Sequence, residues 1–142
     1  MEVSAGQDDD AIDHTVTLAH TASGGDYGSV TGDLVVTVSD DETAALVLTP
    51  PSLTVAEGGS GSYAVALASQ PTAAVTVTLS TGSGVTADTD AATNGNQNTL
   101  NFTTANWNTP QTVEVSAGQD DDAVDDTVTL PHTASGGDYG TV

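Results

Sequence analysis

The chain contains one long segment twice. Residues 2–30 read EVSAGQDDDAIDHTVTLAHTASGGDYGSV, and residues 114–142 repeat this sequence with four substitutions in 29 positions. The second copy begins 112 positions after the first. Self-similarity at a long, fixed period is the sequence signature of an array of like modules. The sequence therefore predicts a tandem repeat with a period of 112 residues, of which this chain covers slightly more than one.

Apolar residues alternate with polar ones along most of the chain, as in Val75, Val77 and Leu79 with threonines between them. Such alternation is typical of half-buried strands, and no stretch has a helical period. Turn residues separate the runs at the spacing of a two-sheet sandwich. We predict an all-β, immunoglobulin-like Greek-key β-sandwich of about seven strands. Its single core is expected to be lined by Val65, Val77, Leu79, Phe102, Val115 and Val128.

The expected strands are out of phase with the ends of the chain. They cover residues 45–56 (interrupted at Pro50-Pro51), 61–68, 74–80, 98–103, 111–117 and 126–133, with 33–39 as the seventh strand of the other module. Residues 1–42 would hold the end of the fifth strand and the last two strands of one repeat. Residues 43–142 would hold the first six strands of the next. Met1 replaces Val113 of the other copy, midway along an expected strand, so we interpret it as an arbitrary start.

The chain carries 20 acidic residues and neither Lys nor Arg, a formal charge of −20. Because no side chain can neutralise phosphate, nucleic acid is excluded as a partner, and attraction to anionic lipid is excluded as well. No segment approaches the roughly 20 apolar residues of a membrane span, so we expect no membrane insertion. The absence of Cys excludes disulfides and Cys-ligated zinc. The composition favours metal cations as partners, or a salty medium that screens self-repulsion.

The carboxylates are clustered at the expected strand ends. Two carboxylates about 4 Å apart repel by roughly 1 kcal/mol in water and by about 4 kcal/mol at an effective dielectric near 20. Calcium offsets this repulsion because it takes several hard oxygen ligands in a flexible geometry. The alternative is that the acidic loops only solvate the surface or adapt the protein to high salt. We predict that Ca²⁺ is bound, with candidate ligands Glu57, Asp90, Asp120, Asp121, Asp122 and Asp125 in one module and Asp8, Asp9, Asp10, Asp13, Asp40 and Asp41 in the other.

Three stretches of the chain resemble a known family. They read VAEGGSGSYAVALASQP, TLNFTTANWNTPQTVEVSAGQDDDAVDDTVTL and GDLVVTVSDDE, and they are similar to the Calx-beta repeat of bacterial surface proteins and sodium/calcium exchangers. The resemblance implies calcium at one end of an immunoglobulin-like sandwich, near the join to the next domain. It implies ligation by Glu57, Asp120, Asp121 and Asp125 in one module and by Asp8, Asp9, Asp13, Asp40 and Asp41 in the other. It also matches Asp90 to the family's loop aspartate, although Ala91 follows it in place of the family's Tyr.

Neither the histidines nor the tryptophan indicate another chemistry. His14 is replaced by Asp126 in the other copy, and His20 and His132 stand in no zinc-binding or hydrolase motif. We therefore expect no enzyme. Trp107 is expected to cap the core beside a turn, with sugar stacking as the alternative.

These observations favour a structural role. Near-identical copies suit a module used for length, whereas a binding tip is usually single and divergent. We expect a calcium-binding spacer of a large extracellular adhesin or filament on the cell surface. Its partners would be neighbouring repeats or identical chains, joined end to end by strand complementation. The alternative is a recognition domain for surface glycans or for another cell-surface partner.

Overall fold

The structure, a computed structural model, describes residues 2–142. Met1 lies outside the described residues, so the interpretation of Met1 stays a prediction. The regular elements are nine strands and one three-residue 3-10 turn, Gly25–Tyr27, and every pairing between strands is antiparallel. Within residues 2–142, no helix has the length and apolar character needed to cross a membrane. The predicted all-β, antiparallel fold class is confirmed.

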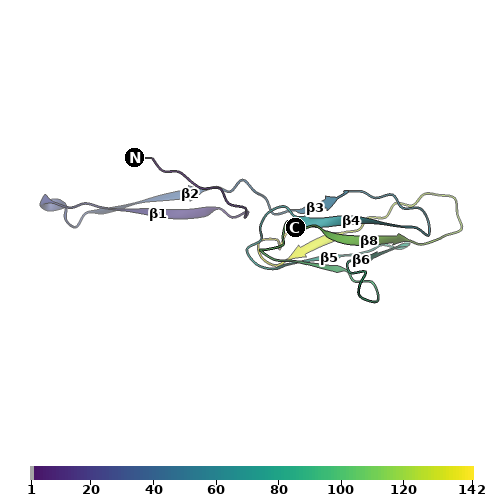
Figure 1. Ribbon diagram of the computed structural model, residues 1–142. Helices are drawn as coiled ribbons and strands as arrows, with labels where there is room; N and C mark the ends of the chain where they lie inside the picture. Colours follow the sequence, from purple (N-terminus) through teal and green to yellow (C-terminus); the bar gives the residue numbers. More distant parts are fainter. Residues whose placement is uncertain (1) are drawn as a thin grey trace.

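Seven of the strands form two sheets that pack against each other. One sheet has the order β3-β4-β8-β6 and the other the order β7-β5-β9, and Figure 1 shows them as two layers. The first order corresponds to the A-B-E-D sheet of an immunoglobulin-like sandwich, with β5 and β9 in the places of C and F. The strands are β3 (Leu46–Thr49), β4 (Ser60–Leu67), β5 (Val75–Leu79), β6 (Val85–Asp88), β7 (Thr99–Phe102), β8 (Gln111–Ala117) and β9 (His132–Ser135).

The core lies between these sheets and follows the predicted alternation. Strand β5 buries Val75, Val77 and Leu79 and leaves the two threonines between them half-buried. Trp107 packs against the edge of the core, as expected. Of the predicted core residues only Val128 is not buried, because it lies in a segment that forms no strand. The predicted residues that are buried are Val65, Val77, Leu79, Phe102 and Val115.

Strand β6 was not predicted. The sequence pattern predicts no strand between residues 80 and 98, but residues 85–88 pair with β8, with Val85 opposite Ala117. The strand is short, and of its residues only Ala87 is buried. Its apolar pattern was therefore too weak to be recognised without the pairing partner.

The predicted strand at 126–133 is wrong in its bounds. The structure has β9 only at His132–Ser135. Strand β9 pairs with β5, and that ladder ends at the pair Leu79 and His132. Residues 126–131 therefore have no neighbouring strand within the described chain. The expected end of a strand at residues 2–5 is absent for the same reason, since these residues have no ladder partner either.

The remaining two strands form a hairpin that projects from the sandwich (Figure 1). Strands β1 (His14–Thr21) and β2 (Thr31–Val38) are paired along their whole lengths. The predicted boundary at residue 42 falls in the link from β2 to β3. One face of the hairpin is apolar and only partly covered, by residues 3–5. The apolar side chains on this face are Val16, Leu18, Leu34, Val36 and Val38.

The two copies of the sequence GGDYG have different surroundings. Tyr139 is fully buried, and its hydroxyl lies 3.0 Å from the backbone N of Ser69, 3.0 Å from its Oγ and 2.9 Å from its O. The equivalent Tyr27 is 64% exposed. A Cβ added at Gly136 (φ +101°) would collide with the carbonyl oxygen of Ala74, whereas a Cβ at the equivalent Gly24 would meet nothing within 4 Å. Nearly the same segment is thus packed in one place and solvated in the other.

Candidate metal centre

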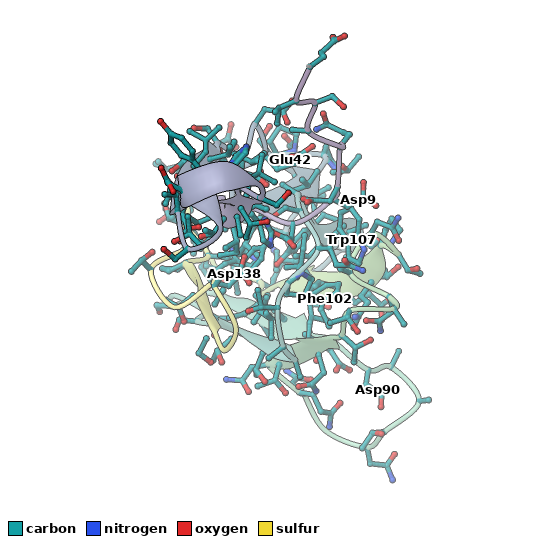
Figure 2. The ribbon with its side chains drawn as sticks, turned by 90° about the vertical axis from the view of Figure 1, so that its left-hand side faces the viewer. Asp9, Glu42, Asp90, Phe102, Trp107 and Asp138 are labelled. Carbon is teal, nitrogen blue, oxygen red and sulfur yellow. The ribbon has the colours of Figure 1, made fainter. Side chains whose placement is uncertain are left out.

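The first acidic set lies where the hairpin joins the sandwich. Asp8, Asp10 and Asp40 each offer an oxygen atom, and these atoms lie within 4.8 Å of one another; Asp40, Asp41 and Glu42 form a second such group. Figure 2 shows Asp9 and Glu42 on the segments that enter and leave the hairpin. We call the residues Asp8, Asp9, Asp10, Asp13, Asp40, Asp41 and Glu42 the junction set.

Backbone hydrogen bonds arrange the junction set. Asp13 accepts a bond from the backbone N of Asp40 at 2.8 Å, which joins the segment before β1 to the segment after β2. Asp40 accepts from the backbone N of Glu42 at 2.8 Å, and Asp10 accepts from that of Ile12 at 2.9 Å. Each of these bonds uses a single carboxylate oxygen. Asp13 therefore positions Asp40, while Asp8, Asp10 and Asp40 converge.

The junction set is also attached to the sandwich. The backbone N of Gln70 donates to the carbonyl oxygen of Asp9 at 2.7 Å, and Asp10 forms an isolated bridge with Gln70. Gln70 in turn donates through Nε2 to the carbonyl oxygen of Thr104 at 2.9 Å. Asp9 thus contributes through its backbone, and it anchors the acidic loop on the strand connections at this end of the sandwich.

Glu42 belongs to the junction set, although it was not among the predicted ligands. Partial burial raises the pKa of its carboxyl above the usual value, and the hydrogen bond with Asp40 and the negative charges of Asp41 and Asp40 raise it further. Its Oε2 is inaccessible to solvent and has no hydrogen-bond partner within the described residues. The signal was present in the sequence, since Glu42 directly follows two aspartates at the end of a strand.

The second acidic set surrounds Glu57 at the other end of the sandwich. The negative charge of Asp120 is the main cause that raises the pKa of Glu57, followed by partial burial and the charges of Asp126 and Asp125. Gln119 donates to Glu57 Oε2 at 2.7 Å. We call Glu57, Asp120, Asp121, Asp122, Asp125 and Asp126 the distal set.

The distal set is less tightly gathered than the junction set. Within residues 2–142, three carboxylates meet within 4.8 Å only in the junction set. Asp121 is exposed, and Asp122 accepts a bond from the backbone N of Val124 at 2.8 Å, so it shapes its own turn. The junction set has the end of β2 beside its loop, whereas the distal loop has no such strand within the described chain. The carboxylates of the junction set are closer together because β2 lies beside their loop.

Asp90 is separate from the junction set. It lies in the loop after β6, and Figure 2 shows it far from Asp9 and Glu42. Its carboxylate accepts from the backbone N of Ala92 at 3.1 Å and from the hydroxyl of Thr93 at 2.7 Å. Asp90 therefore stabilises its own turn, and its role as a calcium ligand stays a prediction.

A partly buried pair of side chains lies at the start of β9. Tyr63 Oη and His132 Nε2 are 2.7 Å apart, and the two rings meet edge to face. Burial raises the pKa of Tyr63 to about 12. Burial lowers the pKa of His132, against a smaller opposite effect of a hydrogen bond to the Leu130 backbone. The imidazole is therefore neutral at pH 7 and the phenol keeps its proton.

We expect His132 to make stability fall on acidification. The pKa of His132 is lower in the folded state than in the unfolded state. At a pH between these two values, the unfolded chain binds more protons than the folded chain. Stability is therefore lost as the pH falls from the unfolded value to the folded value. His132→Gln should flatten the dependence of melting temperature on pH between about 6.5 and 5, the range below the ordinary histidine pKa of about 6.5. His20→Gln, at the equivalent exposed position of β1, is the control. A pH profile that is the same in wild type and His132→Gln would contradict the assignment.

No protein-family model matches the chain, and neither a curated protein nor a solved structure gives a significant match. The resemblance to Calx-beta repeats therefore remains a prediction, carried by the residues that suggested it.

Proposed function

We propose that the chain is a calcium-binding structural repeat of a large extracellular surface protein or adhesin, where it acts as a spacer that calcium stiffens. The observation that supports this most is the position of the junction set. Asp8, Asp10 and Asp40 converge within 4.8 Å at the link between hairpin and sandwich. A cation held there would connect the segment before β1 with the segment after β2. Through Asp9 and Gln70 it would also fix both segments to the sandwich.

Charge supports the same proposal. The chain has no Lys or Arg that could offset the converging carboxylates. Each close pair costs roughly 1 to 4 kcal/mol, depending on the local dielectric. Several hard oxygens in a flexible arrangement are the ligands that calcium prefers, and Glu42 Oε2 adds a buried oxygen that has no partner in residues 2–142.

The positions of the two acidic sets suit an end-to-end array. The junction set lies at the hairpin end of the sandwich, and the loop that carries the distal set extends from the opposite end (Figure 1). A module with an acidic set at each end would have a calcium-binding join to each neighbour. The neighbours would be further repeats or identical chains, on an extracellular surface.

Calcium should stabilise the folded chain and hold the hairpin in place. An ion that binds only the folded state, at about 100 times its Kd, adds about 2.7 kcal/mol per site, and extracellular modules commonly bind in the range of about 0.1–1 mM. We therefore expect a higher melting temperature in about 10 mM calcium, which is about 10 to 100 times such a Kd, than in chelator. We also expect slower hydrogen exchange in β1 and β2, and a binding isotherm by calorimetry.

The double variant Asp10→Asn, Asp40→Asn tests the site itself. It keeps the hydrogen-bond acceptors of the junction set but removes two charges, so the calcium response should be largely lost. Asp26→Asn with Asp33→Asn removes the same charge elsewhere on the hairpin and should keep the response. If sodium chloride of equal ionic strength reproduces the whole effect of calcium, the acidic loops are an adaptation to salt and the proposal fails.

A further inference from the structure

A groove of about 880 Å³ opens between the two sheets beside β9, with apolar side chains and the carboxylates of the distal set in its lining. The apolar part of its lining includes Leu48, Leu53, Val55, Val128 and Leu130. Strand β9 is paired with β5 along one edge. Along its other edge, the backbone hydrogen bond within residues 2–142 is the one from Ala134 N to Val142 O, at 2.9 Å. An open strand edge beside a groove with apolar side chains in its lining is the geometry that accepts an added strand.

The chain itself contains a strand that fits this edge. Strand β1 and residues 126–133 are identical at six of eight positions, and β1 is already paired with β2. The hairpin-closing bond is also the same in both copies, from Ala22 N to Val30 O and from Ala134 N to Val142 O, each 2.9 Å. The pairing of β1 with β2 is therefore a template for the pairing of residues 126–133 with a second β2.

The template predicts which side chains would enter the groove. In the hairpin, Val36 lies opposite Val16 and Leu34 opposite Leu18. Shifted by one repeat, Val36 would lie opposite Val128 and Leu34 opposite Leu130. Cross-strand neighbours share a face of the sheet. Leu34, Val36 and Val38 would therefore point into the groove that Val128 and Leu130 line.

Pro131 does not block this pairing. In an antiparallel ladder, hydrogen-bonded and non-hydrogen-bonded pairs alternate. Ala22 and Val30 form a hydrogen-bonded pair, and Ala19 and Asp33 lie three positions further along the ladder. The pair of Ala19 and Asp33 is therefore not hydrogen-bonded. Pro131 is the equivalent of Ala19, so the N–H that it lacks would not face the added strand. Its carbonyl oxygen accepts from the backbone N of Ser80 at 3.0 Å, on the β5 side.

We propose that β2 of one copy of this chain inserts beside residues 126–133 of a second copy and fills its groove. The inference rests on the proposed end-to-end arrangement and deepens it, because it names the strand, the partner and the register. The backbone ladder that β2 leaves is replaced by one of nearly the same sequence. In exchange, Leu34 and its apolar neighbours in β2 become buried against the second copy. In the hairpin, Leu34 is 49% exposed. A two-stranded hairpin without further strands is only marginally stable, so the exchange favours insertion.

The link between β2 and β3 directs β2 to a second copy. The eight steps of chain from Val38 to Leu46 span at most about 29 Å when fully extended. An inserted Val38 would lie opposite Asp126, while Leu46 starts β3 at the end of the sandwich where β9 finishes (Figure 1). Nine residues of strand separate these ends, which is about 30 Å at 3.3 Å per residue. The two ends also belong to different sheets, which pack about 10 Å apart. Even a fully extended link is therefore too short for the chain's own β2 to reach its own groove.

Insertion would also complete the distal set. Asp13 accepts a bond from the backbone N of Asp40 in the junction set, and Asp125 is the equivalent of Asp13 in the other copy. The inserted strand would therefore bring Asp40 and Asp41 of the donor to Asp125 and Glu57 of the acceptor. Because all these groups are acidic, insertion should require calcium or concentrated salt.

A pair of cysteines tests the register. Thr17 lies opposite Val35 in the hairpin, and Thr129 is the equivalent of Thr17; all three side chains are exposed, and the chain has no Cys of its own. Val35→Cys with Thr129→Cys should form disulfide-linked dimers and longer species on a non-reducing gel in calcium. Val35→Cys with Thr17→Cys should instead close within one hairpin, lock β2, and leave a monomer by light scattering.

Two further variants test the groove without cysteine. Val36→Asp places a charge on the face that enters the groove and should abolish assembly measured by light scattering. Val35→Asp places the same charge on the opposite face and should preserve assembly. Equal assembly of both variants would overturn the proposal.

The solution conditions separate this inference from calcium binding. The absence of interchain disulfides in both calcium and concentrated salt overturns strand insertion. Full assembly of the locked hairpin also overturns it, since the hairpin would then dock as a unit. Interchain disulfides in concentrated salt, together with a melting temperature that does not respond to calcium, support insertion and reject the calcium function.

Discussion

Val77→Asp should unfold the sandwich. Val77 has no exposed surface and lies in the middle of β5, between Leu100 of β7 and Ala134 of β9. A carboxylate at this position would be surrounded by apolar side chains, and the chain has no Lys or Arg that could pair with it. An unpaired buried charge costs several kcal/mol, and the whole stability of a small domain is only about 5–15 kcal/mol. Circular dichroism should show loss of the cooperative thermal transition.

Thr76→Asp is the matched control for this experiment. Thr76 is adjacent in β5 but half-buried on the opposite face, where its hydroxyl donates to Asn101 Oδ1 at 3.0 Å. We expect a folded protein that is less stable by about 1 kcal/mol, the usual size of a lost hydrogen bond. Equal damage from both substitutions would show that the facing of β5 is not the one described.

Tyr139→Phe should destabilise the sandwich by roughly 2–4 kcal/mol, because buried polar groups left without partners cost about 1–3 kcal/mol each. The hydroxyl of Tyr139 lies within hydrogen-bond distance of the N, O and Oγ atoms of Ser69, a residue with no exposed surface. Removing this oxygen takes a hydrogen-bond partner from the backbone N–H and the carbonyl oxygen of Ser69. Urea denaturation followed by circular dichroism measures the difference.

Tyr27→Phe provides an unusually close control, since the same pentapeptide surrounds Tyr27 and Tyr139. Tyr27 is 64% exposed, and surface substitutions usually change stability by less than about 0.5 kcal/mol. A comparable loss in the two variants would mean that the contact with Ser69 does not account for the role of Tyr139.

The sequence was sufficient for the fold class because the core strands keep their alternation. In β5 and in β4 from Tyr63 onward every second residue is buried, so each strand can be recognised without knowledge of its partner. Residues 126–131 could not be assigned in this way. The equivalent residues of β1 form a strand beside β2, yet 126–131 do not, because strand formation depends on a neighbour that local sequence does not contain.

The candidate site was predictable in composition and only partly in geometry. The acidic runs lie in the turns and links that follow strands, which the sequence pattern already indicated. Their role as metal ligands stays a prediction. Which carboxylates converge depends on contacts between residues far apart in sequence, such as the bond from Asp40 N to Asp13. That bond makes Asp13 a positioning group, and the same fold of the loop brings Glu42 into the junction set. The contact of Tyr139 with Ser69, 70 residues away, left no local signal at all.

The two copies of GGDYG also limit how far a result from one repeat can be applied to another. A side chain introduced at Gly24 has open space around it, although its backbone conformation is strained, whereas the same change at Gly136 meets the backbone at Ala74. A substitution scan performed on the hairpin alone would therefore describe a permissive segment, and a scan of the packed copy would describe a strict one. When the same segment occurs in different surroundings, the same substitution has a different effect on stability in each of them. The most crowded of those surroundings decides which residue can serve in all of them.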